Sequence, residues 1–130
     1  MSIAVGFATT PEAAAALSAA VSEAALRGTG LRLYVPAGAD ETPETEALGR
    51  ARDEARAADV ALDVVSLEED TDLGDALIDA SYRADTDVVV IGLRRRSPMG
   101  KLLLGSLSQR ILLEAGCAVH AVKVRVGPRG

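Results

Sequence analysis

The sequence predicts a three-layer α/β/α protein, in which helices cover both faces of a five-stranded, mostly parallel sheet. Short apolar runs alternate with helical segments along all 130 residues, an order typical of parallel sheets with right-handed crossovers. The runs over residues 3–7 and 88–91 lack polar alternation, as expected for strands covered on both faces. No linker, repeat or low-complexity segment divides the chain, so residues 1–130 are expected to form a single domain.

The first strand is predicted over residues 3–7 and the first helix over residues 11–27. The strand is apolar throughout. Thr10 can cap a helix whose first position is Pro11, where the missing N–H costs nothing. Glu12 then complements the positive end of the helix dipole. The helix interior is mostly alanine, and a glycine-containing turn ends it.

The middle of the chain repeats this pattern twice. A second proline-started helix is predicted after Thr42 and Pro43, with alanine and leucine on one narrow stripe. The third helix follows a run of aspartates that suits a helix N-terminus, although these carboxylates could also hold Mg²⁺ if they faced a cleft. The predicted elements are strands over 31–35 and 60–67 and helices over 44–58 and 70–84.

The C-terminal third contains the most apolar strand, Val-Val-Val-Ile over residues 88–91, which is the best candidate for the middle of the sheet. A polar and basic loop follows. Ser106 and Gln109 then have the spacing of a capping box, which predicts a helix over 106–115. The last strand, over 118–126, alternates in its second half, as is typical of a half-exposed edge.

Composition excludes several functional classes. The net charge of −5 opposes binding to nucleic acid or anionic membranes, and an aromatic content of 2% provides few platforms for base stacking. No apolar run approaches the roughly 20 residues that span a bilayer, and the first residues do not resemble a secretory signal. We therefore expect a cytoplasmic protein without a nucleic-acid or membrane partner. One cysteine and one histidine exclude a zinc cluster.

The positive charge is concentrated in one segment. Residues 88–113 contain five basic residues and no acidic one, which leaves −10 for the rest of a chain whose net charge is −5. In parallel α/β folds, ligands bind at the carboxyl ends of the strands, here after residues 7, 35 and 91. Gly105-Ser106 offers free N–H groups where phosphate binds well, so a small anionic ligand is expected. The alternative is a solvated basic loop before an ordinary helix.

Several common sites are excluded by single residues. A Walker A loop would need glycine in place of Arg95 and a hydroxyl in place of Leu102. His120 and Cys117 are interpreted as structural, because no base or acid accompanies them in the sequence. No catalytic or metal-binding residue is predicted. An enzymatic function, such as slow hydrolysis of ATP, is therefore the hypothesis with the least support in the sequence.

The chain resembles a single-domain universal stress protein along essentially its whole length. The resemblance rests on the acid-then-apolar strand over 87–92, the segment over 92–106 and the ending over 111–119. Nucleotide-binding members of that family carry G-x-x-G, nine residues and then G-[ST], and Gly92 and Gly105-Ser106 match the ends of this motif. The resemblance implies a Rossmann-like fold of the adenine nucleotide alpha hydrolase type.

The resemblance also implies a stress-linked regulator that binds an adenine nucleotide (ATP, AMP or cAMP) at the loop over 92–106, with Mg²⁺ only when nucleotide is bound. Two residues depart from the pattern, because Arg95 replaces the second glycine and Ala8 replaces an aspartate. The alternative is a dimeric interaction module that binds no nucleotide. The implied nucleotide-binding positions are Ala8, Thr9, Val35, Ile91, Gly92, Arg94, Arg95, Gly105, Ser106 and Leu107.

The last strand carries a further implication of the resemblance. Universal stress proteins commonly form homodimers through it, and an exposed edge with a valine face could act by strand addition. The implied interface residues are His120, Val122 and Val124. The alternative is a monomer whose edge is protected by Lys123 and Arg125.

Overall fold

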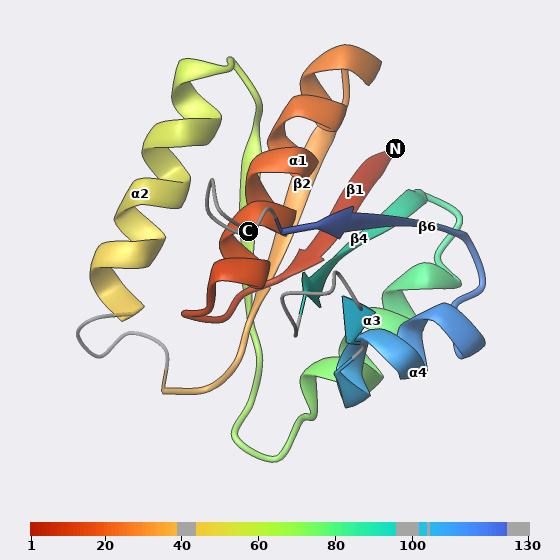
Figure 1. Cartoon of the computed structure of the whole chain (residues 1–130). Coiled ribbons are helices and arrows are strands. Elements are labelled where there is room, and N and C mark those ends of the chain that lie inside the picture. The colour runs from red at the N-terminus through yellow and green to blue at the C-terminus, as the bar shows by residue number, and fades with distance from the viewer. Residues whose placement is uncertain (39–43, 96–101, 104, 125–130) are drawn as a thin grey trace.

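Five parallel strands form the central sheet of the computed structural model over the residues that it describes, 1–38, 44–95, 102–103 and 105–124 (Figure 1). The strands follow the order β3-β2-β1-β4-β6 across the sheet. The predicted five-stranded parallel sheet is therefore confirmed. The strands are β1 (Ser2–Gly6), β2 (Gly30–Val35), β3 (Leu62–Ser66), β4 (Thr86–Arg95) and β6 (Ala118–Lys123).

The helices cover the two faces of the sheet in pairs. Consecutive side chains of β1 point to opposite faces, so Ile3 and Val5 pack under one pair while Ala4 packs under the other. Residues on both sides of β1 therefore meet a helix layer, which explains its continuous apolar run. The helices α1 (Pro11–Arg27) and α2 (Glu44–Ala57) cover one face, and α3 (Leu73–Ser81) and α4 (Ser106–Glu114) cover the other.

The first helix has the predicted ends. The Thr10 hydroxyl accepts a hydrogen bond from the N–H of Ala13 at 3.1 Å, and proline occupies the first turn. Gly28 ends α1 in the left-handed conformation, at φ 64°. Buried alanines let the helix lie close to β1 and β4. The predicted cap of α2 at Thr42 and Pro43 lies outside the described residues.

The predicted middle strand and several predicted bounds are wrong. The middle strand is β1 and not β4, because β3 and β2 lie on one side of it and β4 and β6 on the other. Gly92, Leu93, Arg94 and Arg95 continue β4 instead of forming the start of a loop, and the last two pair antiparallel with a short strand, β5 (Leu102–Leu103). The third strand and third helix are shorter than predicted.

The predicted capping box at Ser106 is also wrong. Gly105 is the N-cap of α4, because its carbonyl already accepts the N–H of Gln109 at 3.0 Å, and no side chain caps this end. With the helix starting at Ser106, two side chains of α4 are directed towards the sheet. The Ser108 hydroxyl donates to the Gly92 carbonyl at 3.1 Å, and Ile111 is fully buried against the sheet.

The last strand lies at the edge of the sheet, as predicted. Within the described residues β6 pairs with β4 alone. Val119 packs towards α3 and α4, whereas Val122 packs towards α1. His120 is exposed and Val124 is half-buried. The final residues of the predicted strand, Arg125 and Val126, lie outside the described residues.

Candidate functional site

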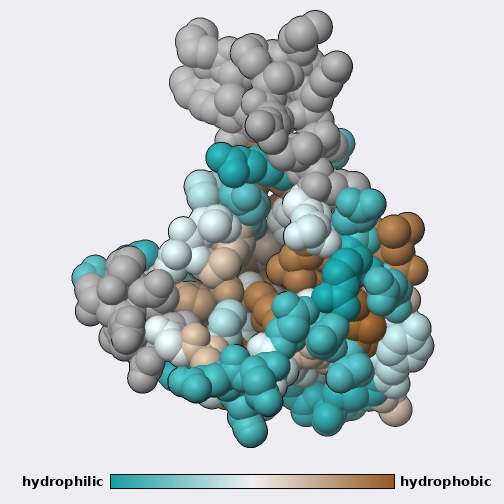
Figure 2. Space-filling view, turned by 90° about the horizontal axis from the view of Figure 1, so that it is seen from below, coloured by the Kyte–Doolittle hydropathy of each residue, from teal (hydrophilic) through white to brown (hydrophobic). Residues whose placement is uncertain are grey.

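The candidate site lies at the carboxyl edge of the sheet, between the ends of β1 and β4. The chain leaves these neighbouring strands on opposite faces of the sheet, to α1 and towards α4, and this divergence is where ligands bind in such folds. A hollow of about 100 Å³ lies there. Figure 2 looks at this edge and shows apolar side chains in its middle with hydrophilic ones around them. The residues that line this hollow include Gly6, Ala8, Thr10, Glu12, Leu73, Leu77, Ile91, Gly92, Leu107 and Ser108.

A second hollow, of about 170 Å³, adjoins the first on the α2 side. The two share Gly6, Ala8 and Ala13 as lining residues. Leu17 and Leu33 are among the apolar residues of the second hollow, and α2 contributes both apolar and charged side chains to it. Ala8 therefore lines both the apolar recess and the hollow beside the start of α4.

The structure brings only some of the predicted site residues together. Four of them, Ala8, Ile91, Gly92 and Leu107, line the first hollow. Gly105 and Ser106 are exposed and directly precede Leu107 in the chain. Three other predicted positions line neither hollow of this edge: Thr9 and Arg94 are exposed, and the Val35 side chain is buried in the α1 and α2 core. The Arg95 side chain lies outside the described residues.

Gly92 has a different role from the one expected. The sequence pattern suggests that this glycine lets a ligand approach the backbone. In the structure, a Cβ on Gly92 would lie 2.1 Å from the Glu12 carbonyl oxygen and 3.0 Å from the Glu12 Cβ. The space is thus filled by the first turn of α1, and Gly92 serves the contact between helix and strand.

The start of α4 presents N–H groups that no side chain of the described residues caps. The first turns of α1 and α3 are capped by the side chains of Thr10 and Asp72, whereas Gly105 offers none. Helix N-termini carry unsatisfied N–H groups and partial positive charge, which together bind anions. Because Gly105 and Ser106 are exposed, this end is open to a phosphate.

Ion pairs reduce the positive charge expected around the site. Arg94 lies 3.9 Å from Glu12. Arg110 donates to Asp72 at 2.9 Å and to Asp75 at 2.6 Å, linking α4 to the start of α3. Hydrogen bonds from the Asp75 backbone and from Arg110 lower the pKa of Asp72. Two of the five positive charges in the basic segment are therefore already paired.

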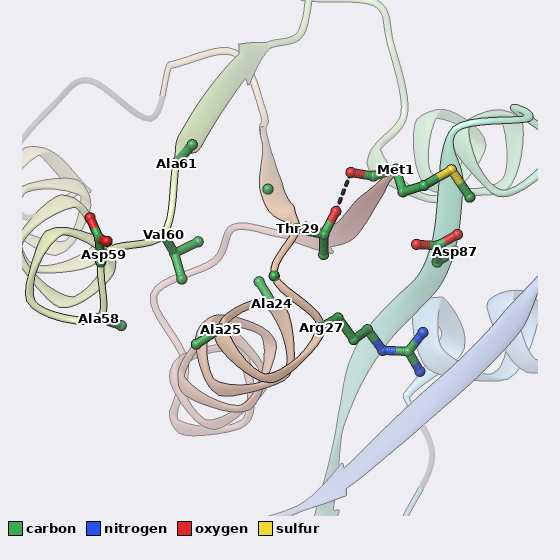
Figure 3. Close-up of a pocket in the computed structure, with 12 residues that line it drawn as sticks. Met1, Ala24, Ala25, Arg27, Thr29, Ala58, Asp59, Val60, Ala61 and Asp87 are labelled. Carbon is green, nitrogen blue, oxygen red and sulfur yellow. Dashed lines mark hydrogen bonds between the residues drawn. The ribbon is translucent and has the colours of Figure 1, made fainter.

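The largest hollow among the described residues lies at the opposite end of the sheet and suits an anion poorly (Figure 3). It has a volume of about 1020 Å³ and is open to solvent. The carboxylates of Asp59 and Asp87 line it beside the C-terminal ends of α1 and α2, which carry the negative ends of the helix dipoles. The Thr29 hydroxyl also bonds to the Met1 carbonyl there. The carboxylates and helix ends therefore disfavour an anion in this hollow, where the lining residue Arg27 is already paired with Glu23 at 2.9 Å.

Comparison with known proteins decides the family. Residues 1–123 match the model of the Universal stress protein family. The chain belongs to this family. A universal stress protein of Mycolicibacterium smegmatis is 36% identical over 126 residues, which cover 93% of this chain and 96% of that protein.

Solved structures of universal stress proteins share the fold. One from Archaeoglobus fulgidus has a TM-score of 0.75 at 27% identity, and it covers 95% of this chain and 98% of its own. Another from Archaeoglobus fulgidus, in complex with dAMP, has a TM-score of 0.69 at 24% identity and the same coverage. A universal stress protein in complex with cAMP has a TM-score of 0.70 at 21% identity, with 96% of this chain and 98% of that chain covered.

The described part of this universal stress protein offers no metal centre. No group of three histidine, cysteine or acidic side chains comes together within it, and Asp72 and Asp75 face Arg110 instead of the hollow. Cys117 is half-buried, and burial raises the pKa of its thiol, which disfavours the reactive thiolate. None of its described helices is long and apolar enough to cross a membrane.

Among the residues that sequence reasoning did not assign to the site, Glu12 and Ser108 are the most important. Both line the first hollow. The position of Glu12 in a first helical turn predicts only a favourable interaction with the helix dipole, and Ser108 lies inside a helix without any motif. The glycine at 92, which admits the Glu12 backbone, is the one local signal that could have pointed to a close contact.

Proposed function

We propose that this protein binds an adenine nucleotide at the carboxyl edge of the sheet and acts as a stress-linked cytoplasmic regulator whose bound state alters its contacts with a partner. The observation that carries the proposal is the exposed, uncapped start of α4 beside a hollow. Helix N-termini of this kind attract phosphate through N–H groups and the helix dipole. The dAMP and cAMP complexes of structural neighbours support an adenine nucleotide as the ligand.

In this proposal, the phosphate lies against the N–H groups of Ser106 and Leu107. The nucleoside extends past Ala8 into the apolar recess beside Leu17 and Leu33. Alanine at position 8 supplies no carboxylate, so Mg²⁺ enters only with the phosphates of its nucleotide. ATP, AMP and cAMP share the adenosine unit, and the number and arrangement of the phosphates then decide among them.

Gly105 provides the sharpest test because binding and stability should respond in opposite directions. A Cβ at this position would meet nothing within 4 Å. Gly105→Asp should stabilise α4 by a few tenths of a kcal/mol, since aspartate is a better N-cap than glycine, but its carboxylate should abolish nucleotide binding. Gly105→Asn is the matched control, because it caps equally well without a charge.

Titration calorimetry with ATP, AMP and cAMP, with and without Mg²⁺, measures these affinities. Ser106→Ala should weaken binding, whereas Ser22→Ala, an exposed serine on α1, should not. Equal affinities for Gly105→Asp and Gly105→Asn would exclude the start of α4 as the phosphate site. No saturable heat with any nucleotide, and no nucleotide released from the purified protein on denaturation, would refute the proposed function.

A second candidate function is an interaction module that has lost nucleotide binding. The size of the first hollow favours it, since about 100 Å³ is smaller than the roughly 300 Å³ at which ligand pockets begin. Arg95 and Ala8 point the same way. The test is Arg95→Gly, which restores the glycine of the family motif: binding by this variant, together with no binding by the parent protein, would support a blocked pocket.

We also propose that two copies associate through β6, with His120, Val122 and Val124 near the contact. The support is the open backbone edge of β6, which pairs only with β4 within the described residues. Strand addition to such an edge satisfies main-chain hydrogen bonds between copies. A concentration-dependent dimer in sedimentation velocity experiments is the expected result, and a monomer at all concentrations would contradict it.

A further inference from the structure

Glu12 is an acidic residue in the wall of the hollow that the proposed function assigns to the nucleotide. It lines the hollow together with Leu107 and Ser108 from the first turn of α4, where the phosphate is expected. Its side chain is only 25% exposed, whereas that of its ion-pair partner Arg94 is 68% exposed. The wall of the hollow therefore carries a half-buried acidic side chain, and the arginine that pairs with it lies nearer to solvent.

The backbone holds this carboxylate in place. The Glu12 carbonyl and Cβ occupy the space that a side chain at Gly92 would need. The Thr10 cap fixes the helical turn that contains Glu12. The Glu12 side chain can rotate, but its Cβ cannot move away from β4 without breaking the contact between α1 and the strand. Any anion at the start of α4 must consequently approach a fixed source of negative charge.

We propose that Glu12 is a specificity-determining residue that makes the site discriminate among adenine nucleotides by their charge. The inference rests on the proposed function. A carboxylate only accepts hydrogen bonds, so it repels phosphate oxygens, and the repulsion grows with the negative charge that the phosphates carry. The site therefore prefers AMP to metal-free ATP, whose additional phosphates carry more negative charge. A repulsive group of this kind is a common source of specificity.

Glu12→Gln tests the inference. The substitution removes the repulsion and frees Arg94 for the ligand while keeping the shape of the side chain. In EDTA, the affinity for ATP should rise about tenfold, equivalent to about 1.4 kcal/mol, and the affinity for AMP should rise much less. Added Mg²⁺ should reduce the difference between Glu12→Gln and the parent, because the ion neutralises phosphate charge.

Glu23→Gln is the matched control. Glu23 lies on the same helix and also pairs with an arginine, Arg27, at 2.9 Å, but it lines neither hollow of the carboxyl edge. Its substitution should leave the ratio of ATP to AMP affinities unchanged. The same ratio in Glu12→Gln as in the parent would overturn the inference while leaving the proposed function intact. Absence of nucleotide binding by both proteins would instead overturn both proposals.

Arg94→Gln supplies a result of opposite sign. Without the Arg94 guanidinium, the Glu12 carboxylate loses its ion-pair partner, so its repulsion of phosphate should increase. The affinity for metal-free ATP should fall further than that for AMP. Circular dichroism confirms that each variant is folded, and an unchanged ratio in Arg94→Gln would contradict a role for the pair in selectivity.

Discussion

At the scale of single residues, one missing Cβ determines how α1 meets β4. Gly92 lies under the first turn of α1, and any larger side chain would overlap the Glu12 backbone. A backbone atom cannot rotate away as the end of a side chain can, so the helix itself would have to move. Gly92 consequently controls both the packing of the helix and the place of the Glu12 carboxylate.

Gly92→Ala should therefore destabilise the protein by about 3 kcal/mol, at the upper end of overpacking effects. Urea unfolding followed by circular dichroism measures the loss. Gly105→Ser is the control, because the added Cβ would meet nothing within 4 Å and serine caps a helix at least as well as glycine, so its effect should stay within about 0.5 kcal/mol. Similar stabilities for the two variants would show that α1 moves away from β4 at little cost.

Asp85 links stability to pH. It accepts a hydrogen bond from Arg83 at 3.1 Å and another from Arg32 at 3.1 Å, and these bonds lower its pKa to about 2. The pKa in the unfolded chain is about 3.9. A lowered folded-state pKa stabilises the protein above the unfolded pKa, and this contribution disappears as the pH falls from about 4 through about 2.

Asp85→Asn should flatten the pH dependence of stability over this range. Unfolding by urea at a series of pH values from 2 to 6 gives the comparison. The pKa of Asp72 is also lowered in the folded protein, so the stability of the variant should still decrease with falling pH, but less steeply than that of the parent protein. If the two curves run parallel below pH 4, the charge on Asp85 does not contribute to stability.

At the scale of elements, the end of α3 is joined to the turn between α4 and β6 by a buried serine. The Ser81 hydroxyl accepts the Gly116 N–H at 2.8 Å and donates to the Ile78 carbonyl at 2.5 Å. The Tyr82 ring lies on Gly116, where a Cβ would be 2.5 Å from the ring. These contacts hold the beginning of the edge strand.

Ser81→Ala should cost about 1 kcal/mol, because it leaves the Gly116 N–H without its partner. Hydrogen exchange should show faster exchange of that amide. Ser22→Ala on the exposed side of α1 should change neither quantity. Unchanged protection of Gly116 in Ser81→Ala would indicate that the turn is held by the tyrosine contact instead.

The elements themselves follow from local signals in the sequence. The Thr10 cap, the alanine stripe and the Gly28 stop act over a few residues, and the structure retains all three. The start of α4 shows the limit of such signals. Ser106 and Gln109 match a capping box in spacing, but the backbone bond from Gln109 to Gly105 places the N-cap one residue earlier. Contacts with the sheet, not the local motif, fix that register.

At the scale of the whole molecule, the candidate site is less predictable than the fold. Arg94 and Arg110 contribute to a strongly basic segment of the sequence, yet they pair with Glu12, Asp72 and Asp75 from distant parts of the chain. Only the tertiary fold brings these charges together. Sequence patterns predict a site at the carboxyl edge because the order of strands and helices determines where that edge lies, but they do not show which residues line the hollow.

The proposed dimer can be tested without altering the core. The Val124 N–H bonds to the Leu93 carbonyl of β4 at 3.1 Å. Because alternate residues of a strand direct their N–H groups to opposite sides, the N–H of the exposed Ala121 points away from β4. Ala121→Pro should prevent strand addition and give a monomer in sedimentation experiments, with the fold retained, since proline is tolerated at such edge positions.

Val122→Ser is not an equivalent test, because Val122 packs against the α1 core and its loss would destabilise the monomer as well. Ala118→Ser serves better as the matched control. Ala118 is exposed on the same strand, and serine keeps the backbone N–H. A dimer that persists in Ala121→Pro would mean that the copies associate through another surface.

The central position of β1 also affects how the chain folds during synthesis. Val5 pairs with Leu33 of β2 on one side and with Val90 of β4 on the other, and β4 is made much later. At roughly 5–20 residues per second, one edge of β1 stays open for several seconds after β2 has emerged. The nascent chain is then exposed to pairing with other chains, so ribosome-bound chains arrested before β4 should be cleaved by protease faster than those arrested after β6.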